Sequence, residues 1–481
     1  MPYEEKSFSQ YFLPYQQLGV IKNATKDILI NIEPDGTHKA NIKVYATSEQ
    51  KGNCVKLYIE DDLVFEDEFD VSPESVYEAQ PEFSEEIKEK NYKLVVENSN
   101  GNELIRYEPA GNKTEEIPDP ARPAKAPEEI ENNDQLYLTA LHLEQYRHAT
   151  YSPVPYYEEA LRRDPGDVRN NNALGKWYLR RGRFEKSEPY FRKAIETLTD
   201  RNPNPYDGEP YYNLGLCLKY QGKPAEAYKA FYKATWNSAW QDNGFFSLAE
   251  IDLARNDYDQ ALYHIDWSLD RNARNSKAWT LKTAILRKLS RFEEALDVAK
   301  QAIKRDPFNL SAYFEQYLIC RQADKEDEAN TALKRFLDLS RKEDQNLISY
   351  SLDYASAGLY KEAISLLSHA LDDSSEKEVH PMVFYYLGWF NSRQGDKESA
   401  LSFYQKGASA CADHCFPNRL EAVPVLFEAQ ELNPDDAKAP YYLGCLFYDK
   451  RQYDLAIDQW ELSAERDDRF PTVHRNLGIA Y

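Results

Sequence analysis

A small side chain recurs at a fixed interval through the last three fifths of the chain. The central five of these positions are alanines separated by four successive intervals of 34 residues. The complete series is Ser187, Ala227, Ala261, Ala295, Ala329, Ala363, Ala400 and Ala456. Self-similarity at a period of roughly 20–50 residues is typical of repeat proteins, in which each unit packs only on its neighbours. The spacing therefore predicts a stack of repeated units in place of a single closed core.

Other residue types keep a constant offset from this small residue. If it is position 20 of a repeat, Leu-Gly pairs fall at positions 7 and 8 and aromatic residues at position 24. The pairs begin at Leu174, Leu214, Leu387, Leu443 and Leu477, and the aromatic residues are Phe191, Phe231, Tyr404 and Trp460. Positions 8 and 20 must be small because two helices cross there and their backbones come close. The pattern resembles the tetratricopeptide repeat (TPR), which implies antiparallel pairs of helices, A and B, stacked into a right-handed superhelix.

We expect this superhelix to occupy residues 134–481, so the predicted fold class is mainly α, a TPR α-solenoid. About nine repeats fit this length when degenerate and partial ones are counted. The first pair, at 134–167, is degenerate, an insert lies at 201–208, and a half-repeat at 416–435 accounts for the longer interval before Ala456. The last repeat is expected to be truncated, because Tyr481 stands at position 11, inside its helix A.

The region before the repeats alternates apolar and polar side chains, which is typical of half-buried strands. The apolar runs begin at Ile28, Ala40, Val55, Leu63 and Lys93. Turn signals separate them at Pro34-Asp-Gly, Lys51-Gly-Asn and Asn100-Gly, and the last of these predicts a hairpin. Residues 1–108 are therefore predicted to form a small β-sandwich of immunoglobulin-like size. Five prolines between Pro109 and Pro127 predict a semi-rigid linker over residues 109–133.

The charge balance restricts the classes of partner. The net charge is −22, and residues 1–130 hold 27 Asp and Glu against 14 Lys and Arg. Nucleic acids and anionic membranes are bound by clustered Lys and Arg, so neither is an expected partner. The N-terminus has no signal-peptide pattern, and no run of about 18 apolar residues occurs. We expect the chain to be cytoplasmic.

Motifs for catalysis are absent, and we predict no catalytic, cofactor-binding or metal-binding residues and no enzyme activity in this chain. Neither a phosphate-binding Gly-x-x-x-x-Gly-Lys loop, nor a Gly-x-Ser-x-Gly nucleophile, nor a His-Glu-x-x-His zinc motif is present. The densest group of potential metal ligands is Cys411-Ala-Asp-His414-Cys415. It lacks a second pair of ligands at zinc spacing, so it is interpreted as an ordinary connection.

A ligand of such a superhelix is expected in the concave groove, where positions 2, 5, 9 and 12 of the A helices point. Asn213 is added because chaperone-docking TPR domains, which this array resembles, hold a carboxylate with an Asn there, although their full clamp is not reproduced. Trp240 is added from an aromatic cluster with Tyr206, Tyr212, Trp236 and Phe246. The candidates are His142, Arg169, Asn172, Lys176, Tyr212, Asn213, Lys219, Trp240, Asn243, Phe246 and Glu250. This mixture of polar and aromatic side chains suits a peptide or a sugar.

A closer resemblance rests on four segments. They are Leu141–Tyr151, Leu161–Asp167, Arg201–Gly215 and Ala234–Asn237. They resemble the C-terminal half of large bacterial proteins in which a β-rich domain, similar to carbohydrate-processing supersandwich domains, precedes a small sandwich and TPR repeats. The resemblance implies a carbohydrate context and transfers no catalytic residue, and the chain is expected to be part of a larger protein.

Two functions follow as hypotheses. The first is a scaffold that binds a protein or peptide in the concave groove. The alternative is an accessory part of a bacterial carbohydrate-active protein, which contributes to a sugar site with a missing upstream domain. The alternative requires the surface from Tyr206 to Trp240 to be exposed and to converge with His142 and Arg147.

Overall fold

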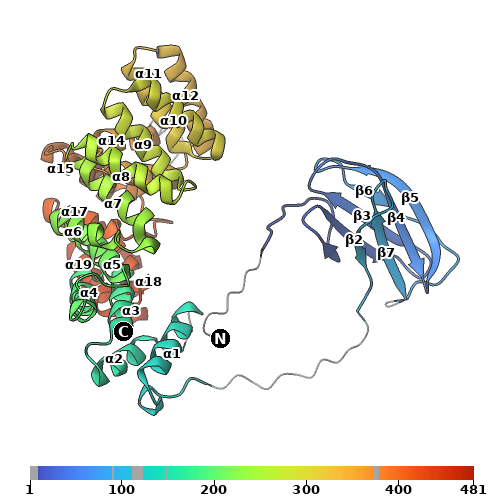
Figure 1. The fold of residues 1–481 in the computed structure, drawn as a ribbon, viewed down its shortest axis with the longest axis horizontal. Helices are drawn as coiled ribbons and strands as arrows, with labels where there is room; N and C mark the ends of the chain where they lie inside the picture. The colour runs from blue at the N-terminus through green and yellow to red at the C-terminus, as the bar shows by residue number, and fades with distance from the viewer. Residues whose placement is uncertain (1–8, 89–90, 111–122, 147–149, 372–378) are drawn as a thin grey trace. The chain divides into compact units, whose positions relative to one another are not determined.

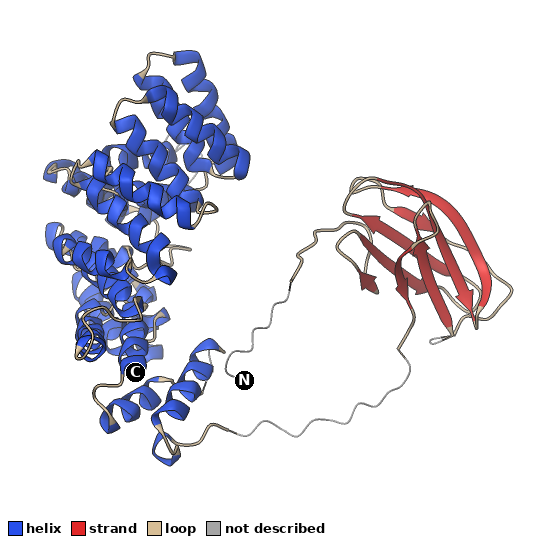
Figure 2. Ribbon diagram, viewed as in Figure 1, coloured by secondary structure: helices blue, strands red, loops and turns tan. Residues whose placement is uncertain are grey.

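The computed structural model describes residues 9–88, 91–110, 123–146, 150–371 and 379–481. The chain divides into two compact units, Met1–Arg122 with the strands and Pro123–Tyr481 with the helices (Figures 1 and 2). No helix in the described ranges combines the length and the apolar character needed to cross a lipid bilayer.

The first unit is a β-sandwich of two antiparallel four-stranded sheets, with strand orders β1-β2-β3-β6 and β5-β4-β7-β8. The strands are β1 (Asn23–Ala24), β2 (Ile28–Pro34), β3 (Ala40–Ala46), β4 (Gln50–Ile59), β5 (Asp62–Val71), β6 (Tyr77–Ala79), β7 (Tyr92–Glu97) and β8 (Glu103–Tyr107). Ile30 and Val44 of one sheet share a fully buried core with Leu57 and Val96 of the other. The predicted small β domain ahead of the helices is confirmed.

The predicted hairpin at Asn100-Gly101 is present. Strand β7 pairs with β8 so that Val96 faces Ile105, and Gly101 takes a left-handed φ of 77° in the turn. A glycine tolerates this conformation because it has no Cβ.

The predicted turn at Lys51-Gly-Asn53 is wrong. These residues lie inside β4, where the pairing with β5 shifts by one residue between Gln50 and Asn53. Gly52 has a φ of 65°, and its N–H donates to Asp70 Oδ1 at 2.8 Å. This is a β-bulge, and bulges use glycine for the same conformational reason as turns do. The glycine signal therefore could not distinguish the two.

The second unit is a solenoid of helices, and the predicted fold class is confirmed. The first ten helices are α1 (Asn133–Gln145), α2 (Val154–Arg163), α3 (Val168–Leu179), α4 (Phe184–Thr199), α5 (Glu209–Tyr220), α6 (Pro224–Ala234), α7 (Gln241–Ala254), α8 (Tyr258–Arg271), α9 (Ser276–Lys288) and α10 (Phe292–Arg305). The remainder are α11 (Leu310–Gln322), α12 (Glu326–Ser340), α13 (Asp344–Ser356), α14 (Tyr360–Ser368), α15 (Pro381–Arg393), α16 (Lys397–Ser409), α17 (Ala422–Leu432), α18 (Lys438–Asp449), α19 (Tyr453–Arg466) and α20 (Pro471–Ala480). Short 3₁₀ turns occur at η1 (Pro127–Glu129), η2 (Ser238–Trp240) and η3 (His369–Leu371).

Close packing at the helix crossings explains the repeat pattern. A Cβ on Gly175 would lie 2.6 Å from the Phe191 ring, and one on Gly215 would lie 2.5 Å from the Phe231 ring. Gly388 and Gly444 have the same relation to Tyr404 and Trp460. The small residues at position 20, from Ser187 to Ala456, have no exposed surface. In these four pairs position 8 therefore has to be glycine, because the aromatic residue at position 24 of the same pair fills the space beside it.

Two parts of the unit depart from regular pairs. Helix α17 stands alone between the pair α15–α16 and the pair α18–α19, in the segment predicted as a half-repeat. Residues 111–122 of the predicted linker lie outside the described residues. Ala124 and Ile130, which follow them, pack on the apolar cluster around α1 and α2.

The array closes on itself, because helices far apart in the sequence meet. Gly182, in the turn after α3, lies against Val423 of α17 and Phe447 of α18. Tyr220, at the end of α5, donates a hydrogen bond to Glu421 Oε1 at 3.0 Å. Figure 1 shows α17 to α19 beside α3 to α5.

Candidate binding cavity

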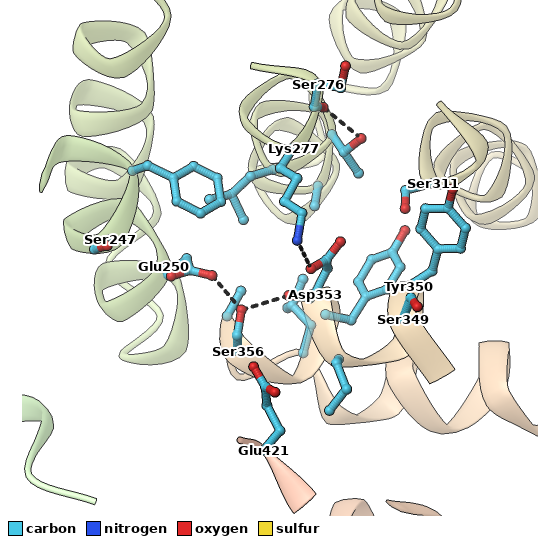
Figure 3. Close-up of a pocket in the computed structure, with 18 of the residues that line it drawn as sticks. Ser247, Glu250, Ser276, Lys277, Ser311, Ser349, Tyr350, Asp353, Ser356 and Glu421 are labelled. Atoms are coloured by element: carbon cyan, nitrogen blue, oxygen red, sulfur yellow. Dashed lines mark hydrogen bonds and ion pairs between the residues drawn. The ribbon is translucent and has the colours of Figure 1, made fainter. Parts of the chain in front are cut away.

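A cavity of about 570 Å³ lies between A helices of the helical unit. Helices α5, α7, α9, α11 and α13 line it, together with the turn before α11 and the connection that leads into α17. Figure 3 shows lining residues of α7, α9, α11 and α13 and, from that connection, Glu421. The polar residues that line it are Lys219, Ser247, Glu250, Ser276, Lys277, Thr280, Asp306, Asn309, Ser311, Asn346, Ser349, Asp353, Ser356, Arg419 and Glu421, and the aromatic residues are Tyr212, Phe246, Phe308, Tyr350 and Tyr354.

Helical spacing brings these side chains to one face. On α5, Tyr212, Leu216 and Lys219 are separated by four and three residues, which places them in one stripe. On α9, Lys277 and Thr280 follow the same rule. Successive A helices therefore present parallel stripes to the cavity.

Two ion pairs connect neighbouring walls of the cavity. Lys219 Nζ of α5 lies 2.7 Å from Glu250 Oε2 of α7. Lys277 Nζ of α9 lies 2.6 Å from Asp353 Oδ1 of α13. Ser356 of α13 donates a hydrogen bond to Glu250, so that α7 and α13 are bridged directly (Figure 3). The turn after α13 also packs closely on α7, because a Cβ on Gly358 would lie 2.7 Å from the Cβ of Ala254.

Two other carboxylates in the cavity have no cationic partner among the described residues. Asp306 accepts hydrogen bonds from the Ser276 hydroxyl at 3.1 Å and from the Phe308 N–H at 3.0 Å. Glu421 accepts a hydrogen bond from the Tyr220 hydroxyl. Arg419 also lines the cavity; it is not paired with a carboxylate of the described ranges, and it donates to Ser349 Oγ at 2.6 Å. Carboxylates thus exceed cations in the cavity.

The environment of Asp353 reflects this excess. Burial raises the pKa of its carboxyl above the usual range, although Lys277 opposes the change. Glu250 and Glu421 raise the pKa further by repulsion. Burial likewise raises the pKa of Tyr350, with Asp353 and Asp306 contributing. A cation placed among these carboxylates would be stabilised by them.

The structure brings four of the sequence-predicted groove residues into the cavity, namely Tyr212, Lys219, Phe246 and Glu250. Trp240 lies behind them, stacked on Tyr212 with ring centroids 5.0 Å apart.

The other groove candidates lie elsewhere. Asn172 and Asn213 are buried and bonded to each other, with Nδ2 of Asn213 donating to Oδ1 of Asn172 at 3.0 Å. Lys176 Nζ lies 2.6 Å from Glu209 Oε1, and Arg169 is paired with Asp134. His142 and Asn243 are exposed on α1 and α7. None of these six residues lines the cavity.

The aromatic cluster around the insert does not form one surface. Tyr206 is 94% exposed and Trp236 is 54% exposed, whereas Tyr212 and Phe246 belong to the cavity wall. Lys233 Nζ lies 3.5 Å from the centroid of the Trp236 ring. Arg147, with which this surface was expected to converge, lies outside the described residues.

The later half of the cavity was missed by the sequence interpretation. Positions 2, 5 and 9 of the repeat that begins at Ser276 are Lys277, Thr280 and Ala284, and all three line the cavity. Extending the groove rule beyond the first four repeats would have found them. Arg419 and Glu421 carry no such signal, because the connection before α17 follows no repeat pattern.

The segment Cys411–Cys415 shows no metal site. Among the described residues, no group of three His, Cys, Asp or Glu side chains has a metal-binding arrangement. Cys415 is buried, and burial raises the pKa of its thiol to about 12. This is the opposite of the shift that favours a thiolate ligand.

Comparisons with known proteins agree with this architecture. Residues 167–235 and 246–309 match family models of the tetratricopeptide repeat, and residues 23–107 match the model "YphG-like protein, second domain". Residues 167–309 therefore contain TPR repeats, as predicted.

Several solved structures align with low identity. A tetratricopeptide repeat protein from Parabacteroides merdae ATCC 43184 is 12% identical over 57% of this chain and 98% of its own, with a TM-score of 0.26. YrrB, a TPR protein with an unusual peptide-binding site, is 19% identical over 39% of this chain and 95% of its own, with a TM-score of 0.23. MamA (AMB-1) is 16% identical over 36% of this chain and 99% of its own, with a TM-score of 0.32.

Proposed function

We propose that this array of tetratricopeptide repeats is a binding scaffold that takes a basic segment of a partner protein into the cavity between α5, α7, α9, α11 and α13. The observation that carries the proposal is the set of four carboxylates in the cavity wall, of which Asp306 and Glu421 have no cationic partner among the described residues. A Lys or Arg side chain would supply the missing charge.

The rest of the lining supports a peptide. Asn346 is exposed, and its Oδ1 can accept a hydrogen bond from a peptide N–H, whereas its Nδ2 donates to the Ser340 carbonyl oxygen. Phe308 and Tyr350 offer ring faces, on which a cationic group can be stabilised by about 0.5–2 kcal/mol. The volume, about 570 Å³, is within the usual range of small-ligand pockets and admits one or two side chains rather than a folded domain.

The test is a binding screen with two peptide sets of equal length, one containing Lys and Arg and the other containing Gln at the same positions. We expect the basic set to bind and the Gln set to bind at least about tenfold more weakly, equivalent to about 1.4 kcal/mol. Asp306→Asn and Glu421→Gln should each weaken binding of the basic set. Asp458→Asn, an exposed position on α19 outside the cavity, is the matched control and should leave binding unchanged.

An oligosaccharide array run beside the peptides separates this proposal from the carbohydrate hypothesis. Glycan binding that is lost in Trp240→Ala, with no preference for basic peptides, would replace the proposal. Equal binding of both peptide sets would also refute it, because the unpaired carboxylates would then have no role in recognition.

A further inference from the structure

A second cavity, of about 400 Å³, lies where the first repeats meet the last ones. Trp177 and Tyr178 of α3 and Arg183 and Lys186 at the start of α4 line one side. The turn between α18 and α19, with Arg451, lines the other. No lining residue is shared with the first cavity.

This cavity is positively charged in a chain whose net charge is −22. Arg183, Lys186 and Arg451 line it, and Arg181 stacks on Trp177 with its guanidinium carbon 3.5 Å from the ring centroid. None of these four cations forms an ion pair with a carboxylate among the described residues. Asp454 is the one carboxylate in the lining. Arg183 donates to the amide oxygen of Gln452 at 3.2 Å, a neutral partner.

Two buried donors at this place have no acceptor within the described part of the chain. Trp177 is 7% exposed, and its indole Nε1 has no hydrogen-bond partner. The buried Nε of Arg181 also has none. A buried donor left unpaired costs about 1–3 kcal/mol, so such groups are rare unless a ligand or water completes them.

The pKa of Arg181, next to the cavity, is also shifted. The pKa of its guanidinium is lowered to about 10, mainly by burial, with Glu144 opposing the change and repulsion by Arg451 and Arg180 adding to it. An anion close to Arg181 would oppose this shift.

We propose that this cavity binds an anionic group, a carboxylate or a phosphate, carried by a segment of a partner protein. Its oxygens would accept hydrogen bonds from Arg183 and Arg451, whose planar guanidinium groups suit bidentate contacts with either anion. The apolar side chains of Val154 and Leu455 border the cavity and would contact the rest of the segment.

The cavity lies between an early and a late part of the array. Arg183 belongs to the first half of the array and Arg451 to the last, so a bound anion contacts both sides of the closure. A ligand that binds only the closed arrangement stabilises it by mass action. Binding should therefore raise the melting temperature of the protein as well as produce a calorimetric signal.

The experiment titrates the full chain with three probes at low salt. They are inorganic phosphate, an acetylated and amidated tetraglutamate peptide, and the corresponding tetraglutamine peptide. We expect binding of phosphate, tetraglutamate or both, with no binding of tetraglutamine, and the stronger of the two anions identifies the natural group. Arg183→Gln and Arg451→Gln should each weaken anion binding about tenfold and reduce the rise in melting temperature at a given anion concentration.

Arg335→Gln, an exposed position on α12, is the matched control and should bind as the wild type does. Because Arg451 is exposed at the rim, its variant is expected to fold even if Arg183→Gln does not. The proposal is overturned if neither anion binds, if tetraglutamine binds as well as tetraglutamate, or if Arg451→Gln binds as tightly as the wild type.

Discussion

Arg287 of α9 and Glu315 of α11 form a bidentate ion pair with no exposed side-chain surface. Nε of Arg287 lies 2.8 Å from Oε2 of Glu315, and Nη2 lies 3.1 Å from Oε1. Glu362 of α14 accepts a further hydrogen bond from Arg287, and the Tyr354 hydroxyl donates to Glu315. The network joins three successive repeats, so it fixes how they stack on one another.

Removing Arg287 alone should therefore destabilise the array strongly. In Arg287→Met, Glu315 remains buried without its cation, and breaking a buried pair in this way costs about 3–5 kcal/mol. Urea unfolding followed by circular dichroism measures the loss. The control is Arg291→Met, whose pair with Glu294 is half exposed, and it should cost less than about 1 kcal/mol. Equal midpoints for the two variants would contradict the prediction.

The second prediction concerns the glycine at the helix crossing. In Gly215→Ala the new methyl group would meet the Phe231 ring at 2.5 Å, so the pair α5–α6 has to move apart. Overpacking of this kind costs about 1–3 kcal/mol. Gly478→Ala occupies the same repeat position in α20, where nothing lies within 4 Å, and should gain up to about 1 kcal/mol from helix propensity. Thermal unfolding should therefore show a lower melting temperature for Gly215→Ala and a higher one for Gly478→Ala.

These glycines illustrate what the sequence could predict. Gly215 and Phe231 lie within one repeat, so their contact follows from local spacing, and the fold class followed from the recurrence of such pairs. The closure between Gly182 and Val423 depends on small rotations added over many repeats, which no single motif specifies. The sequence therefore placed Lys219 and Glu250 on one face but gave no sign that Arg419 and Glu421 would lie opposite them.

The third prediction is a pH dependence at Asp353. Its pKa is raised in the folded state above the ordinary value of 3.8, so the folded protein holds this proton more tightly than the unfolded chain does. Below pH 3.8 the difference has no effect, and as the pH rises through the raised pKa the contribution of this group to stability falls. Asp353→Asn has no such proton. Its stability relative to the wild type should therefore improve as the pH rises across this window, measured by unfolding at a series of pH values.

If the stability of Asp353→Asn relative to the wild type fell as the pH rises, the ion pair with Lys277 would affect the pKa of Asp353 more than burial does. Lys277→Ala separates these effects, because it leaves Asp353 partly buried without its cation. In that variant the pH dependence should become steeper.

The fourth prediction tests the closure of the array. Gly182 and Gly222 occupy the same turn after α3 and α5, with φ of 72° and 70°. Alanine is strained in this conformation by roughly 1–2 kcal/mol at either position. Only Gly182 has neighbours, since its Cβ would lie 3.2 Å from Val423 Cγ2, whereas nothing lies within 4 Å of Gly222. Both variants should therefore lose similar stability in the turn, but only Gly182→Ala should push α17 away from the first repeats.

Hydrogen exchange by mass spectrometry should show faster exchange in α17 and α18 for Gly182→Ala and unchanged exchange there for Gly222→Ala. Equal protection of α17 in the two variants would mean that the contact at Gly182 does not hold the array closed.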